Sequence, residues 1–179
     1  MELSNRFRVF AKSLFWFTTA VMIALVIMVL TFAVSPDFAK STLMRNAPDD
    51  LTILVPPTTA TVYALLASGC VALGLQFFVL WNMRALFRLY AQGQALSAAC
   101  GGHIARIGAG VIAIPFAGVF YDAMSSFLLT RHNPPGQGEV SIGIQTTSIG
   151  LMVGGGMLLL VGAAMLEASR QADENRSFV

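Results

Sequence analysis

Four long apolar runs alternate with polar connections along this chain. The runs cover residues 14–34, 59–81, 107–129 and 148–166. Each run has about the 20 apolar residues that a helix needs to cross the hydrocarbon core of a bilayer, and none contains Lys or Arg. The pattern predicts an all-α membrane protein, a four-helix bundle that forms one integral domain over residues 1–179.

The connections at 35–58 and 130–147 each contain a stretch that alternates like a β-strand. Residues 140–145 carry a branched apolar side chain at every second position, and residues 51–55 alternate less regularly. A strand alone leaves its backbone donors and acceptors unpaired. We therefore expect the two stretches to pair as a small antiparallel β-element that caps one end of the bundle.

The junctions between these stretches and the next apolar runs resemble each other. Thr58 and Thr59 precede the second run as Thr146 and Thr147 precede the fourth, and each pair is placed to cap a helix. Two interpretations stay open. Either the two halves are a parallel repeat of the kind found in some transporters, or any two such junctions look alike.

Basic residues gather on one side of the predicted membrane. Eight of the eleven Lys and Arg residues lie in the N-terminal tail, the connection 84–106 and the C-terminal tail. The other two connections carry Lys40, Arg45 and Arg131. Because cytoplasmic loops are enriched in Lys and Arg, we expect a multi-pass protein with both termini cytoplasmic and the β-element extracytoplasmic.

The composition changes this picture little. Only 11% of the residues are charged, against about 25% in a typical soluble domain, and mean hydropathy is +0.72. The lipid bilayer is therefore the expected surrounding. A net charge of +2 offers no basic footprint for direct binding of nucleic acid.

No pattern indicates catalysis, a cofactor or a metal site. His103 and His132 lie on opposite sides of the predicted membrane, and Cys70 and Cys100 lack the spacing of a zinc site or of a disulfide framework. The chain contains no zinc-protease, nucleophile-elbow or phosphate-loop motif. We therefore expect that the protein is not an enzyme.

Asp122 is the one acidic residue inside a predicted span. An acid within a membrane is costly and marks a candidate functional site. One interpretation is a proton or cation site. The other is that Asp122 lies near enough to the outer interface to be hydrated, or to pair with Arg131.

The connection after the second run begins as a continuation of its helix. Arg84 and Arg88 are spaced to share one helix face, Gly93 is placed to end the helix, and Gly101 and Gly102 predict a turn or hinge. The segment is either a docking surface for a cytoplasmic partner or an interfacial anchor whose arginines lie near lipid phosphates.

The C-terminal stretch continues the fourth helix in the same way. Glu167, Arg170 and Asp173 are spaced three residues apart, which suits pairing along one helix. The acids could also pair across to Arg84 or Arg88, which would complete a cytoplasmic partner surface. The alternative is a solvated helix end in which each pair contributes little.

Gly150 and Gly154 form a G-x-x-x-G step in the fourth run. Small residues at this spacing allow two helices to approach closely. The step predicts either the seam of a homo-oligomer or packing among the chain's own helices.

Three stretches together resemble one protein family. They are MRALFRLYAQGQAL after the second run, NPPGQGEVSI in the second outer connection and EASRQADENRSFV at the C-terminus. In order and spacing they are similar to an uncharacterised bacterial membrane family, domain of unknown function 2975. This chain departs from the family at Leu96, where an aromatic residue is usual, and in the Arg-poor stretch that follows.

The resemblance covers the chain roughly from the second run to the end. It implies a four-span protein of the bacterial inner membrane with no established activity. Some members of the family that this chain resembles are encoded beside small helix-turn-helix regulators. The resemblance therefore implies a regulatory role.

These observations favour a non-enzymatic regulatory or accessory membrane module that acts through a cytoplasmic protein partner. The alternative is a small transporter or channel-like protein with Asp122 on its path. Facing polar groups inside the bundle would favour transport, whereas a dry interior would favour a partner.

Overall fold

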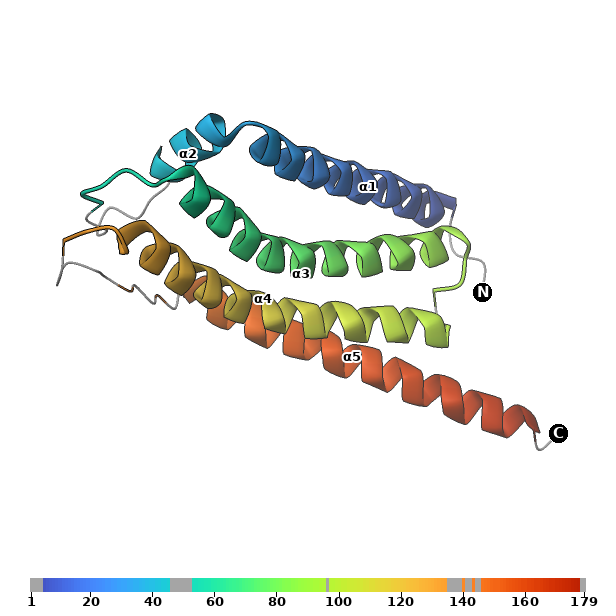
Figure 1. The fold of residues 1–179 in the computed structure, drawn as a ribbon. Helices are drawn as coiled ribbons and strands as arrows, with labels where there is room; N and C mark the ends of the chain where they lie inside the picture. The colour runs from blue at the N-terminus through green and yellow to red at the C-terminus, as the bar shows by residue number, and fades with distance from the viewer. Residues whose placement is uncertain are drawn as a thin grey trace.

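The described part of the chain is all-helical, and its four long helices are confirmed as candidate membrane spans by length and composition. The computed structural model describes residues 5–45, 53–95, 97–134, 140, 143 and 146–177, with side chains up to 172 in the last helix. The helices are α1 (Asn5–Val34), α2 (Pro36–Arg45), α3 (Thr59–Ala91), α4 (Ala98–Thr130) and α5 (Thr146–Ser177) (Figure 1).

Local sequence explains where the long helices begin and end. The side chain of Thr58 accepts a hydrogen bond from the backbone of Thr61 at the start of α3, as its capping role predicted. Ser97 caps α4 in the same way. Gly93 follows the end of α3 with φ of +83°, a conformation that favours glycine. Its predicted role in ending the helix is confirmed.

The short helix α2 lies in the first outer connection and was not predicted. Its signals are local: Pro36 at the first position, Asp37 in the first turn and Arg45 in the last turn. Each suits the end of the helix at which it lies. The helix contacts α1 and α3, and Ala39 is its buried residue.

The four long helices lie in an open row and not in a closed bundle. The order is α1, α3, α4, α5, since each contacts its neighbour in this row while α1 contacts neither α4 nor α5, and α3 does not contact α5. Figure 1 shows this sequence of helices side by side, with both ends of the chain at the same end of the row. The four long helices predicted from the sequence are present, and α1 and α5 form the two edges of the row.

Four glycines let the backbones of α4 and α5 touch, and we call them the glycine seam: Gly101, Gly108, Gly155 and Gly162. A methyl group built on Gly108 would lie 2.5 Å from the backbone nitrogen of Leu159, and one on Gly155 would lie 2.8 Å from the Gly108 carbonyl oxygen. In each helix the two seam glycines are seven residues apart, so they share a face. Such close approach is how helices associate in lipid.

The opposite face of α4 packs on α3 through another glycine. A methyl group on Gly110 would lie 2.5 Å from Cγ2 of Val79. Gly110 is two residues from Gly108, which turns it to the other side of the helix. These two packed faces place α4 between α3 and α5 in the row.

Two expectations about glycines need correction. Gly101 and Gly102 form no turn or hinge, because both lie inside α4, and Gly101 packs against the backbone of α5. Open space lies beside Gly150 and Gly154, so the close approach within this chain falls at the glycine seam. Contact of Gly150 and Gly154 with a second copy stays a prediction.

The predicted β-element is not supported by the described part of the outer connections. Residues 53–55, Val140 and Gly143 lie in no strand. The remaining residues of both predicted strands, 51–52, 141–142 and 144–145, lie outside the described residues.

The two outer connections meet by a different contact. The backbone N–H of Leu54 donates to the side-chain Oδ1 of Asn133 (3.2 Å), so the donor that a β-ladder would use is already satisfied. Pro56 and Pro57 follow without any N–H to continue a ladder. A side chain therefore joins the connections where paired strands were expected.

Gly154 and Gly155 give a matched pair of substitutions. Gly155→Ala would place its methyl group against Gly108 and Ile112, so we expect it to lower stability by about 1–3 kcal/mol through overpacking. Gly154→Ala meets nothing within 4 Å and should leave stability unchanged or raise it by up to about 1 kcal/mol. Thermal unfolding in mild detergent measures both variants. Equal midpoints would count against the seam.

Candidate functional site

The residues singled out in the sequence fall at two pockets and on one helix end. One pocket contains Asp122 and lies toward the end of the row that carries α2, which we call the outer end. The other contains Arg84 and Arg88 and lies at the end that carries both termini, which we call the inner end. The helix end is the last part of α5, with Glu167 and Arg170.

The outer pocket has a volume of about 440 Å³ and is lined by α1, α2, α3 and α4. Its walls are mostly apolar, with Phe32, Leu43 and Leu65 among them. The helix α2 closes it over the ends of α1 and α3. Asp122 is the one acidic residue that lines it.

The carboxylate of Asp122 forms no ion pair within the described residues. The nearby serine hydroxyls donate to its backbone carbonyl instead, Ser125 at 3.0 Å and Ser126 at 2.8 Å. The expected alternative of pairing with Arg131 is not found, since Arg131 Nε donates to Nε2 of His132 (3.4 Å). Asp122 is exposed, and its carboxylate lies without an ionic partner among the described residues at the edge of an apolar pocket.

The inner pocket, which we call the basic pocket, has a volume of about 450 Å³. It is formed where α1, α3 and α4 come together. Its lining residues are Phe15, Trp81, Arg84, Ala85, Arg88, Leu89, Gln92, Ala99 and His103. None of them is acidic, so two arginines face no compensating charge in the lining.

Arg84 is held in place by α1. Its Nε donates to Oγ1 of Thr19 (2.9 Å), and its guanidinium carbon lies 4.6 Å from the ring centroid of Phe15 and 5.8 Å from that of Trp81. Cation–π contact and a hydrogen bond fix the planar group. Because only Nε is used, its terminal nitrogens stay available to a ligand.

His103 is oriented by a neighbour on α3. The amide nitrogen of Asn82 donates to the Phe78 carbonyl (2.9 Å), which leaves its Oδ1 to accept from Nδ1 of His103 (3.0 Å). This pattern places the proton of a neutral ring on Nδ1. Nε2 of the neutral ring is then an acceptor, which can receive a hydrogen bond from a ligand but not donate one.

Sequence reasoning found Arg84 and Arg88 but missed the residues that build a pocket around them. Thr19, Phe15 and His103 belong to other helices, and no spacing in the chain reveals a contact between α1 and α3. The one local signal was Trp81, three residues before Arg84 and therefore on the same helix face.

The two charged side chains that the structure describes near the end of α5, Glu167 and Arg170, pair with each other. Arg170 and Glu167 form the predicted i,i+3 ion pair (2.8 Å), and Gln171 also donates to Glu167 (3.3 Å). The expected pairing of Glu167 with Arg84 or Arg88 is wrong, because α4 separates α5 from α3. The side chain of Asp173 lies outside the described residues.

The last turns of α5 extend beyond the rest of the row, and we call residues 170–177 the arm. Gly101 lies beside Met165 and Leu166, so in this antiparallel pair the first residue of α4, Ala98, lies level with about Ser169. The eight residues that follow add about 12 Å of helix. Figure 1 shows α5 projecting past its neighbours at this end.

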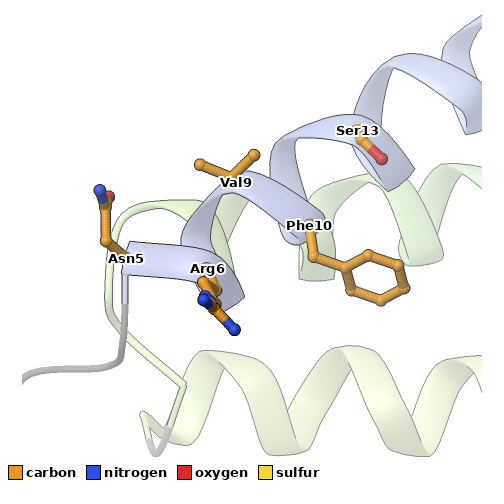
Figure 2. Close-up of a pocket in the computed structure, with 5 residues that line it drawn as sticks. All are labelled: Asn5, Arg6, Val9, Phe10 and Ser13. Carbon is orange, nitrogen blue, oxygen red and sulfur yellow. The ribbon is translucent and has the colours of Figure 1, made fainter.

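A third hollow, of about 390 Å³, lies at the start of α1. Figure 2 shows that its five lining residues, Asn5, Arg6, Val9, Phe10 and Ser13, all come from the N-terminal turns of this helix. One helix cannot surround a ligand, so the hollow provides a comparison for the basic pocket and not a second site.

No protein-family model, no curated protein and no solved structure matches the chain.

Proposed function

We propose that this protein is a non-enzymatic integral membrane module that acts through a protein partner. The proposed partner binds at the end that carries both termini. The observation that carries this proposal is the arm, a helix end that continues for eight residues past the level of the first residue of α4.

The start of the arm is stabilised by contacts within its own helix. Glu167 anchors its first turn through Arg170 and Gln171, and such pairs stabilise an isolated helix by about 0.2–0.5 kcal/mol each. The described side chains at its start, from Arg170 to Ala172, are exposed. A segment that is already helical loses less conformational entropy when a partner covers it than a disordered segment does.

The open row also favours a partner over a self-contained transporter. Transport requires a path enclosed by protein on all sides. In this chain α1 and α5 do not meet, so one copy encloses no such path. The free edges are instead available to another membrane chain.

We further propose that both termini are cytoplasmic and that the membrane is a bacterial inner membrane. The excess of Lys and Arg at this end supports the orientation. The resemblance to the four-span bacterial family, domain of unknown function 2975, supports the location and the regulatory or accessory role.

Removal of the arm tests the proposed partner. A chain truncated after Ser169 should keep its thermal midpoint, because the arm begins where the helix α4 that packs on α5 has already ended. Crosslinking in native membranes followed by mass spectrometry should recover a stoichiometric partner with the full chain and about tenfold less with the truncated one. A crosslinking probe at the exposed Val9, at the same end of the row, should capture less of the partner than a crosslinking probe at Ala172.

Recovery of the full chain alone, or equal recovery of the partner with both chains, would contradict the proposal. Recovery as a homo-oligomer alone would also contradict the proposal, and the free edges of the row, α1 and α5, would then be the surfaces to test for contact between copies.

Transport is the second candidate function, and the unpaired carboxylate of Asp122 favours it. A second copy of the chain would have to complete the path. In liposomes that contain the purified protein, Asp122→Asn should abolish proton or cation flux. Asp37→Asn, on α2 and outside the pocket lining, is the matched control. Flux that is absent from the unaltered protein, or unchanged by Asp122→Asn, would rule this candidate out.

A further inference from the structure

The basic pocket has the chemistry of an anion site. Arg84 and Arg88 lie one helical turn apart on α3 and line the same space, and Gln92 lies one turn further. Arg88 forms no hydrogen bond or ion pair with the described residues, and the pocket lining contains no Asp or Glu. Its positive charge is thus not neutralised from within.

The pocket is built before any ligand arrives. Thr19, Phe15 and Trp81 hold the Arg84 guanidinium, and Asn82 orients His103. The small side chains of Ala85 and Ala99 lie in its walls and leave room between the arginines and the imidazole. The fixed guanidinium group of Arg84 suits a phosphate group, which accepts paired hydrogen bonds from it.

The depth of the pocket matches the headgroup layer of a membrane. A hydrocarbon core of about 30 Å takes about 20 residues of helix. In a helix that enters the core at Thr59, Arg84 lies about 37 Å along the axis, about 7 Å beyond the core and in the outer part of the polar layer. Trp81 lies one turn before Arg84, at the level where the hydrocarbon core meets the polar layer, and Trp is enriched at this interface.

We propose that the basic pocket binds a phosphate group, with Arg84 and Arg88 as its charged donors. Basic pockets between membrane helices at this level recognise anionic lipid headgroups, and the apolar walls formed by Phe15, Trp81 and Leu89 suit the glycerol and upper acyl chain of a lipid. A free inorganic phosphate offers the same oxygen acceptors. The inference does not depend on the proposed protein partner.

Arg88→Gln is the most direct test, because Arg88 supports no other part of the fold. Arg84→Gln would also remove the contact with Thr19 and could fail to fold. Arg6→Gln is the matched control. Arg6 lines the hollow in Figure 2, which is formed by one helix at the same end of the row. The substitution therefore removes the same charge as Arg88→Gln but leaves the basic pocket intact.

Native mass spectrometry of the full chain in neutral detergent would measure binding of phosphatidylglycerol, phosphatidylcholine and inorganic phosphate, each added alone. We expect the unaltered chain and Arg6→Gln to prefer phosphatidylglycerol, and Arg88→Gln to bind it about tenfold more weakly, the effect of one lost charge-assisted hydrogen bond. Inorganic phosphate that binds alone with the same dependence on Arg88 would support the phosphate site and identify a soluble source. Equal binding of both lipids without any phosphate binding, or binding that Arg88→Gln leaves unchanged, would overturn the proposal.

Discussion

Close backbone contact between α4 and α5, made by the glycine seam, is the interaction on which the rest of the structure depends. In lipid, apolar side chains gain nothing by leaving the solvent, so helices associate through close packing of small residues. The seam glycines bring backbone atoms of α4 and α5 within reach of each other. Gly110 does the same for α4 and α3 on the opposite face. With both faces of α4 occupied, no face is left for α1.

The open row follows from this arrangement, and so does the position of each candidate site. Because α1 contacts α3 and not α4, spaces lie between α1 and α4 at both ends of the row. At the outer end α2 covers this space and forms the apolar pocket beside Asp122. At the inner end Phe15 and Thr19 reach Arg84 and form the basic pocket. The arm projects because α5 is longer than the α4 segment that it covers.

Features that depend on local sequence could be predicted, and those that depend on contacts between helices could not. The four spans, the cap at Thr58, the end of α3 at Gly93 and the Glu167–Arg170 pair all arise within one helix or turn. The seam could not be found from spacing alone, since Gly150 and Gly154 have the more familiar pattern while Gly155 makes the contact.

The outer connections show why alternation was a poor guide there. The apolar alternation before Pro56 is typical of a strand, yet a strand also needs a partner backbone, and the side chain of Asn133 binds Leu54 instead. The short helix α2 was missed because its signals, Pro36 and Asp37, identify a helix start but not its packing. Pocket residues such as His103 gain their meaning only when α3 and α4 are placed together.

A distance between α1 and α5 tests the open row most directly. Spin labels at Ile23 and Met157 would serve, because both side chains are exposed and each lies eleven residues from the outer end of its helix. The native Cys70 and Cys100 would be replaced by Ser. The open row predicts a backbone separation of about 20–30 Å, the width of several helix spacings of 8–10 Å. A separation of about 10–14 Å, the side or diagonal of a closed bundle, would contradict it.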